Sequence, residues 1–253
     1  MGLQDAFYDD LAPYFREYAR RRRAYLEAID RLVGARLKGT SLLDVGSGDG
    51  VRASVLAARA GLEHLELVEP SPPMAALCRQ VCLCVRPVSI QQLELPPGTF
   101  DNVTCLWNVL GHIRGFEARV AALQKMGSLL TAGGSLHLDV HNRYNLRAYG
   151  WRTVVRNLLH DLAHPGRENG EREFELIVSD RRLRGRGYLF NPREIRRTIR
   201  ASGLRVLDRA VIDYQTGRPH GTALEGQLYF QLGLPEHEFP PRAAKSHGSV
   251  VGF

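Results

Sequence analysis

The chain has 253 residues, of which 44% are hydrophobic and 24% are charged, and these fractions are ordinary for a globular protein. No apolar run reaches the roughly 18 residues that a membrane-spanning helix needs. The first residues, MGLQDAFYDD, are acidic and lack the apolar stretch of a secretory signal. We therefore expect a cytoplasmic protein that has no membrane partner.

The formal net charge is +7, and arginine supplies nearly all of the positive charge. Such a balance could indicate RNA or another anionic partner. The two arginine clusters, at 20–23 and 181–186, are not interleaved with aromatic residues on which bases could stack. The charge therefore does not predict a nucleic-acid partner, and we expect a monomer or a homodimer.

The N-terminal residues 1–39 are predicted to form helices outside the main sheet. They place tyrosines, among them Tyr8 and Tyr14, between charged residues. Aromatic residues at these spacings are typical of packing, and a helical lid over a ligand is also a natural place for them.

Short apolar strands and helical stretches alternate over residues 40–141, which is the pattern of a parallel sheet covered by helices. The expected strands have the sequences TSLLDV, HLELVEP, LCVRPVSI, DNVTCLWNV and SLHLDVH. The sequence predicts an α/β, Rossmann-like, doubly wound and mostly parallel sheet.

Residues 142–190 interrupt this alternation with a predicted helix over 151–162 and a β-hairpin made of REFELIVSD and LRGRGYLF. A helix and two closing strands follow within 191–235, which brings the expected sheet to seven strands. Residues 236–253 are proline-rich and polar, so we expect a flexible tail behind a single domain that spans 1–235.

A glycine-rich turn follows the first strand in the stretch LLDVGSGDG, residues 42–50. Gly46, Gly48 and Gly50 form GxGxG, and glycine lets a ligand approach the backbone without meeting a Cβ. The dinucleotide pattern GxGxxG differs in spacing, and no phosphate-binding GxxxxGK[ST] occurs. Glu69 ends the second strand, where a carboxylate can accept hydrogen bonds from two ribose hydroxyls. This combination favours a nucleoside ligand without a pyrophosphate.

Four segments together resemble the class I S-adenosylmethionine-dependent methyltransferases. LLDVGSGDG resembles their first motif, LELVEP their second, LPPGTFDNVTCLWNVLGHI their fourth-strand segment, and LLTAGGSLHLDV their post-strand L-x-P-G-G-x-L motif. The resemblance implies S-adenosylmethionine as cofactor and S-adenosylhomocysteine as product. It also implies that residues 1–39 close over the cofactor, that 40–141 bind it, and that 142–190 shape the substrate side.

The resemblance also assigns cofactor contacts residue by residue. Asp44 is expected to orient the glycine turn and the ligand amine, and Glu69 to bind the ribose. The family often has an acid after the third strand, where this chain has Ser89 and Ile90. The full set of predicted cofactor residues is Tyr8, Tyr14, Arg23, Asp44, Gly46, Gly48, Gly50, Glu69, Pro70, Ser89, Ile90 and Asn108.

The resemblance implies that the end of the fourth strand faces the sulfonium and that the connector after the fifth strand faces the methyl acceptor. Asn108 is a candidate polar contact, and His112 is a candidate general base, although it could also only cap or pack a helix. The polar connector DVHNRYN suggests the substrate contacts Asn142, Arg143 and Tyr144, with a solvated loop as the other interpretation. Its Asp and His lack a third carboxylate, so we predict no metal site.

The leading hypothesis is a methyltransferase that acts on an amine or hydroxyl of a small molecule. Methylation of RNA or protein through the arginine clusters remains an alternative. A protein that binds S-adenosylmethionine without catalysis is a further one.

Overall fold

The computed structural model describes residues 3–166 and 169–235, and the predicted tail at 236–253 lies outside them. The chain begins with helices that pack beside the sheet through a cluster around Phe7, Leu11 and Phe15. Pro13 lies in a 3-10 turn that separates the first two of them. The N-terminal elements are α1 (Leu3–Leu11), η1 (Ala12–Tyr14), α2 (Phe15–Arg20) and α3 (Arg23–Gly34).

The main sheet has the strand order β3-β2-β1-β4-β5-β10-β8-β9. The strands β1 to β5 pair in parallel, and β10 pairs antiparallel with both β5 and β8. The strands are β1 (Ser41–Val45), β2 (His64–Val68), β3 (Val85–Arg86), β4 (Phe100–Cys105), β5 (Leu130–Val140), β8 (Arg205–Ile212), β9 (Pro219–His220) and β10 (Gln227–Gly233). The predicted Rossmann-like fold is confirmed, and the seven expected strands are joined at the edge by the two-residue β9.

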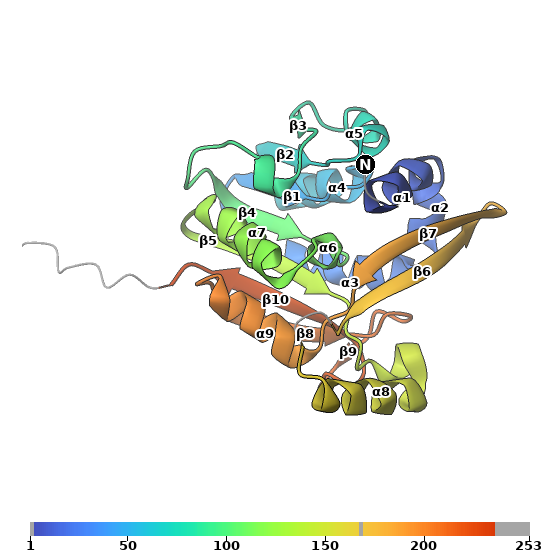
Figure 1. The fold of residues 1–253 in the computed structure, drawn as a ribbon. Helices are drawn as coiled ribbons and strands as arrows, with labels where there is room; N and C mark the ends of the chain where they lie inside the picture. The colour runs from blue at the N-terminus through green and yellow to red at the C-terminus, as the bar shows by residue number, and fades with distance from the viewer. Residues whose placement is uncertain (1–2, 167–168, 236–253) are drawn as a thin grey trace, which may run out of the picture.

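Helices cover both faces of this sheet, and Figure 1 shows α7 and α9 side by side in front of it. Their apolar faces, including Leu123, Met126 and Ile195, pack with Leu136 and Leu138 of β5 in the largest hydrophobic core. The helices of this part are α4 (Val51–Ala60), α5 (Pro72–Cys78), η2 (Ile90–Gln92), α6 (Val109–His112), α7 (Phe116–Ser128) and α9 (Pro192–Ala201). No helix of the described residues is both long and apolar enough to cross a membrane.

The segment between β5 and α9 consists of α8 (Leu146–Ala163) and a hairpin of β6 (Glu171–Val178) and β7 (Arg181–Tyr188). The hairpin extends from the end of β5 to the N-terminal helices, where β7 contacts α1 (Figure 1). Ser179 and Asp180 have φ values of +43° and +60°, which are the left-handed conformations of a tight hairpin turn. The segment therefore closes one side of the space above the sheet.

Two predicted strands are shorter in the structure than the sequence suggests. The third covers only Val85–Arg86, because Ile90 turns into the 3-10 helix η2 and packs in the core. The fourth ends at Cys105, because Trp107 and Asn108 adopt φ values of +60° and +63°. Consecutive left-handed non-glycine residues are unusual and occur often at functional sites.

Candidate active site

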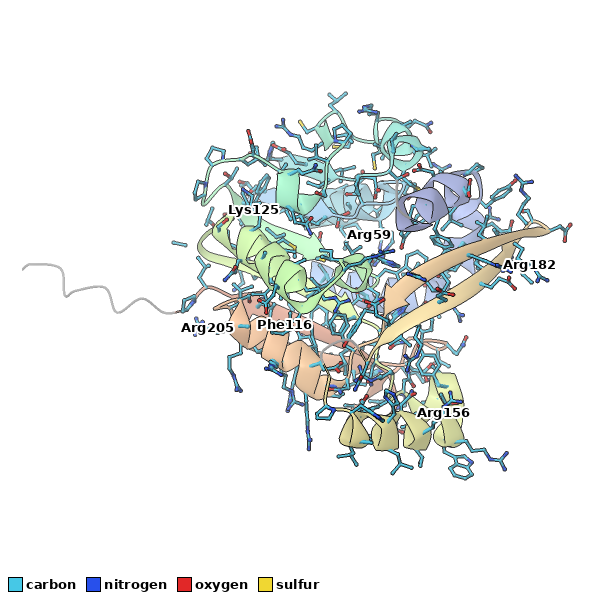
Figure 2. The ribbon with its side chains drawn as sticks, viewed as in Figure 1. Arg59, Phe116, Lys125, Arg156, Arg182 and Arg205 are labelled. Atoms are coloured by element: carbon cyan, nitrogen blue, oxygen red, sulfur yellow. The ribbon has the colours of Figure 1, made fainter. Side chains whose placement is uncertain are left out.

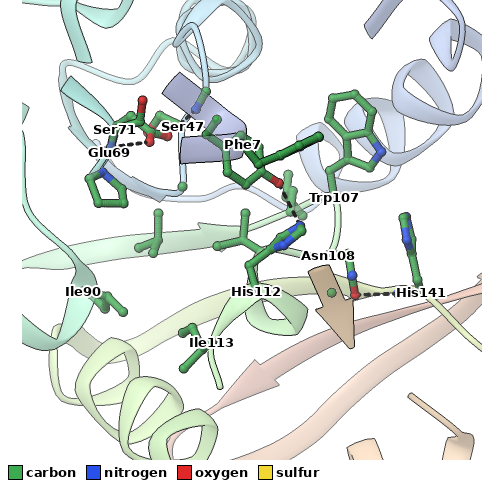
Figure 3. Close-up of a pocket in the computed structure, with 18 of the residues that line it drawn as sticks. Phe7, Ser47, Glu69, Ser71, Ile90, Trp107, Asn108, His112, Ile113 and His141 are labelled. Atoms are coloured by element: carbon green, nitrogen blue, oxygen red, sulfur yellow. Dashed lines mark hydrogen bonds between the residues drawn. The ribbon is translucent and has the colours of Figure 1, made fainter. Parts of the chain in front are cut away.

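A cavity of about 1060 Å³ opens at the carboxyl ends of β1, β2, β4 and β5. Ligands of open α/β sheets bind at this edge. The turn after β1 and the ends of β2 and β4 line one half of the cavity. The α6 start, α8 and the β6–β7 hairpin line the other half, and α1 and α2 lie over it. Figure 3 shows residues from both halves around one space.

The glycine turn after β1 forms the floor of the first half. Gly46 and Gly48 have φ values of +73° and +60°. A Cβ would lie 2.5 Å from Val109 at the first position and 2.5 Å from Phe15 at the second, so only glycine fits. Both glycines line the cavity, whereas Gly50 does not and instead precedes α4 as its N-cap.

Glu69 lies beside this turn, with only 6% of its surface exposed. Its carboxylate accepts hydrogen bonds from the backbone N–H of Gly48 at 2.8 Å and of Ser71 at 3.0 Å (Figure 3). Burial is the main cause that raises the pKa of Glu69 to about 7, and the nearby carboxylates of Asp44 and Asp9 contribute to this rise. The following Pro70 also lines the cavity, so the end of β2 provides a buried acceptor aimed at the turn.

We expect the affinity for S-adenosylhomocysteine to increase as the pH rises from 6 to 8. Ribose hydroxyls donate to an ionised carboxylate, and Glu69 with a pKa of about 7 is protonated in the free protein below that pH. Its folded pKa lies above its ordinary value, so Glu69 stabilises the free protein below about pH 4.5, and this contribution is lost as pH rises through 7. Titration calorimetry in buffers of different ionisation enthalpy would detect the released proton. An affinity independent of pH in this range would contradict the assignment.

Asp44 lies at the end of β1 and also lines the cavity. Its carboxylate accepts a hydrogen bond from the Thr104 hydroxyl at 2.6 Å, and its carbonyl accepts one from the Ser47 hydroxyl at 2.9 Å. Burial raises its pKa. Asp44 therefore joins β1, β4 and the glycine turn, consistent with the predicted role in orienting the turn.

Ser89 and Ile90 line the cavity on the side of β3. The Ser89 hydroxyl donates to the Gln92 side chain at 3.0 Å, which fixes the start of η2. Ile90 is 3% exposed and belongs to the main core. Together they offer an apolar edge with one hydroxyl where the resemblance expects the adenine ring.

The Tyr8 hydroxyl lies 2.7 Å from Nε2 of His112, so α1 and α6 meet over the cavity (Figure 3). Nδ1 of His112 lies 3.2 Å from the carbonyl oxygen of Arg186, which can only accept a hydrogen bond. Nδ1 therefore carries the proton, and Nε2 accepts the bond from Tyr8. Burial lowers the pKa of His112 to about 4, which keeps the imidazole neutral at pH 7.

Asn108 lines the same space, but both ends of its amide are engaged. Its Nδ2 donates to the carbonyl of Tyr188 at 3.3 Å, and its Oδ1 accepts from the backbone N–H of His141 at 2.9 Å. The preceding Trp107 donates its backbone N–H to Asp139. These bonds hold the left-handed turn after β4 against β5 and β7. Asn108 thus shapes the cavity by joining three strands.

The three predicted substrate contacts Asn142, Arg143 and Tyr144 do not line the cavity. The Arg143 side chain is fully buried and forms ion pairs with Asp161 of α8 and Glu194 of α9. The Tyr144 hydroxyl donates to the same Asp161, and the Asn142 amide donates to the carbonyl of Gly226 at 3.0 Å. This prediction is therefore corrected, because these side chains fasten the end of β5 to α8 and α9.

Two residues of the predicted lid lie elsewhere as well. Tyr14 packs in the aromatic cluster of the N-terminal helices and does not line the cavity. Arg23 is exposed and pairs with Glu27 one helical turn further on. The structure thus brings Tyr8 into the cavity and leaves the other two outside it.

Several cavity residues carry no motif that sequence reasoning used. Phe15 contacts the glycine turn, and Tyr18 stacks on Trp107 with ring centroids 4.9 Å apart. Leu11, Phe15 and Tyr18 recur at helical spacing, and this periodicity is the sequence signal that could have placed them on one face. On the opposite side the cavity residues without a motif include His141, Tyr149, Thr153, Arg156, Asn157, Arg172, Glu173 and Phe174.

Comparison with known proteins identifies the class of domain. A family model described as a methyltransferase domain matches residues 15–209. The ubiquinone biosynthesis O-methyltransferase of Chromobacterium violaceum is 34% identical over 129 residues, which are 49% of this chain and 53% of that protein. The ubiquinone biosynthesis O-methyltransferase of Pseudomonas paraeruginosa is 32% identical over 126 residues, which are 48% of this chain and 51% of that protein. The chain thus spans about half the length of these curated relatives.

Solved structures share the fold. An S-adenosylmethionine-dependent methyltransferase from Clostridium acetobutylicum superposes with a TM-score of 0.61 at 14% identity, covering 90% of this chain and 99% of the other. An amino pentose methyltransferase from Micromonospora echinaspora, solved with S-adenosylmethionine bound, has a TM-score of 0.54 at 22% identity. The superposition covers 86% of this chain and 95% of the chain of that methyltransferase.

Proposed function

Since the chain belongs to the methyltransferase-domain family, we propose that it is an S-adenosylmethionine-dependent methyltransferase that methylates an amine or hydroxyl of a small molecule beside His112. The main observation that supports this proposal is the position of His112. Its neutral imidazole lies between the half of the cavity lined by the glycine turn and the half lined by α8 and the hairpin. A cavity of this volume is at the upper end of the range for small-molecule sites.

The first half of the cavity fits the cofactor. Gly46 and Gly48 line this half with backbone that carries no side chain, and Glu69 provides a buried carboxylate for ribose hydroxyls. When bound, the cofactor supplies a methyl carbon on a positively charged sulfur. The acceptor atom bonds to that carbon as the carbon–sulfur bond breaks, and the sulfur keeps the electron pair.

The proton that leaves the acceptor can go to Nε2 of His112. This nitrogen holds a lone pair, and it now accepts the hydrogen bond of Tyr8. An acceptor N–H or O–H could replace the tyrosine hydroxyl there, or pass its proton through it. The pKa of about 4 keeps His112 available as a base at neutral pH.

The class of acceptor is supported by the known activities of the relatives, as their names give them. The curated proteins are ubiquinone biosynthesis O-methyltransferases, and one structural neighbour acts on an amino pentose. Both names point to small acceptors. Enclosure of the second half by α8 and the hairpin also favours a small molecule over a polymer.

The decisive experiment incubates the protein with methyl-labelled cofactor and a cell extract, and then separates metabolites, RNA and protein. We expect the label in one or a few metabolites, and we expect its loss with a Glu69→Gln variant. Label confined to RNA or protein would contradict the proposal. An RNA substrate would also show steeply salt-dependent binding.

A further inference from the structure

The half of the cavity lined by α8 and the hairpin contains an arginine that forms no ion pair with any residue the structure describes. Arg172 of β6 is partly buried and lines the cavity. Its guanidinium donates to the carbonyls of Asn169 and Glu171 at 3.0 and 2.7 Å, and to the Asn157 side-chain oxygen at 3.3 Å. All three acceptors are neutral. Among the residues that the structure describes, Arg172 forms no ion pair, although a charge at such a place is usually paired.

The other charges of the hairpin are arranged differently. Glu173 pairs with Arg186, and Glu175 lies 3.5 Å from Arg182 and 3.6 Å from Arg184. These residues alternate with Arg172 along the strands, so their side chains lie on the other face of the hairpin, although Glu173 at the cavity edge also lines the cavity. Figure 2 shows Arg182 on this outer part, toward the hairpin tip. The charged side chains of the outer face thus form ion pairs with one another. Arg172 on the inner face has no ion-pair partner among the described residues.

The inner face of the hairpin lines the cavity through Arg172, Phe174 and Gly187. Arg172 is opposite Gly187 and Phe174 is opposite Gly185 in the antiparallel register. Opposed residues share a face, and a Cβ at Gly187 would lie 3.5 Å from the His112 ring. Arg172 therefore points to the side of the hairpin on which the candidate base lies.

A second arginine, the exposed Arg156 of α8, lines the same cavity. Its neighbour in sequence, Asn157, accepts the bond from Arg172. Arg156 has no ion-pair or hydrogen-bond partner in the described part of the chain, and Figure 2 shows it on α8 below the hairpin. The Tyr149 hydroxyl, with its pKa raised to about 12 by burial, adds a donor nearby.

From this arrangement we infer that the methyl acceptor carries an oxyanion, a carboxylate or a phosphate group, which Arg172 and Arg156 bind while the nucleophilic atom faces His112. The inference rests on the proposed function for the location of the acceptor. Arginine presents a planar fork that matches both kinds of oxyanion. The Phe174 ring on the same face leaves an apolar surface for the body of the molecule between the two ends.

The test measures binding of inorganic phosphate and of succinate to the full chain saturated with S-adenosylhomocysteine. We expect at least one of the two anions to bind, and the stronger of them distinguishes a phosphate from a carboxylate site. Arg172→Gln and Arg156→Gln should each weaken that binding about tenfold or more, because a charge-assisted hydrogen bond is lost. S-adenosylhomocysteine itself should bind these variants as it binds the wild type.

Matched controls come from the same elements. Arg184→Gln removes a cation from the outer face of the hairpin, and Arg152→Gln removes one from α8 that does not line the cavity. Both controls should bind the anion like the wild type. The inference is overturned if neither anion binds, or if Arg172→Gln binds it as tightly as the wild type.

The labelled product provides an independent check. It should be retained on an anion exchanger at neutral pH, and a labelled metabolite that passes unretained would overturn the inference. If no metabolite acquires label but anion binding depends on Arg172 and Arg156 as described, the oxyanion site stands and the proposed acceptor class fails.

Discussion

Replacement of His112 by glutamine is expected to lower kcat by about 100-fold or more, the usual effect of removing a positioned general base. Glutamine can keep a hydrogen bond to Tyr8 but cannot accept a full proton. The affinity for S-adenosylhomocysteine should change little, because the proposed function places His112 beside the acceptor and Glu69 and the glycine turn around the cofactor. Steady-state kinetics with the acceptor found in the extract experiment would measure this.

Two other variants separate catalysis from packing. Tyr8→Phe keeps the ring that packs edge-on against His112 at 5.2 Å between centroids, and removes only the hydroxyl. His64→Gln changes a histidine of β2 that does not line the cavity and should leave kcat unchanged. A kcat for His112→Gln within a factor of about three of wild type would assign His112 a packing role.

The pH dependence of stability follows from the same histidine. Burial places the folded pKa of His112 at about 4, below its ordinary value of 6.5. The neutral form is therefore favoured in the folded protein. This contribution to stability is present above about pH 6.5 and is lost as the pH falls toward 4. His112→Gln should reduce the acid sensitivity of folding in that window.

Replacement of Arg143 by alanine is expected to reduce the free energy of unfolding by about 3–5 kcal/mol, because it leaves two carboxylates without their cation. The guanidinium has no exposed surface, and Asp161 and Glu194 are 12% and 20% exposed. It also donates to the carbonyl of Leu189 at 2.8 Å, which fixes the end of the hairpin. Urea unfolding of the variant would measure the loss.

The matched control is Arg184→Ala, which removes a surface arginine whose side chain is 79% exposed. Such a pair contributes about 0–1 kcal/mol. A loss below about 1 kcal/mol for Arg143→Ala would contradict the structural role assigned to it.

The half of the cavity beside the glycine turn and Glu69 was largely predictable, because the sequence patterns that indicate it are local. A strand followed by GxGxG and an acid at the end of the next strand are short patterns, and parallel strands bring both to one edge of the sheet. Gly46, Gly48 and Glu69 accordingly lie around one space. The prediction of an alternating sheet was equally local, since each strand and helix shows its own periodicity.

The half of the cavity lined by α8 and the hairpin was not predictable in the same way, because contacts between residues far apart in the sequence determine which side chains face it. In the sequence, the polar stretch after β5 resembles an exposed binding loop. In the structure, Arg143 is buried by its ion pairs with Asp161 and Glu194, which lie 18 and 51 residues further along the chain. Alternation along β6 places Arg172 and Phe174 on one face, but only the contact of β7 with α1 determines that this face turns inward.

The N-terminal helices show the same limit. Tyr8 and Tyr14 are equivalent as aromatic residues between charges, and nothing in their neighbours distinguishes them. The 3-10 turn around Pro13 changes the direction of the chain after α1. Tyr8 then faces His112, and Tyr14 packs away from the cavity.

The central claim is that the space beside Glu69 holds the methyl donor, and calorimetric titration tests it most directly. The wild type should bind S-adenosylhomocysteine more tightly than NAD. Glu69→Gln should weaken that binding by about 1–3 kcal/mol, the cost of unpaired buried groups. Glu66→Gln, which removes a buried carboxylate of β2 outside the cavity, should bind like the wild type. Equal affinity in a folded Glu69→Gln variant, or tight NAD binding without S-adenosylhomocysteine binding, would contradict the account.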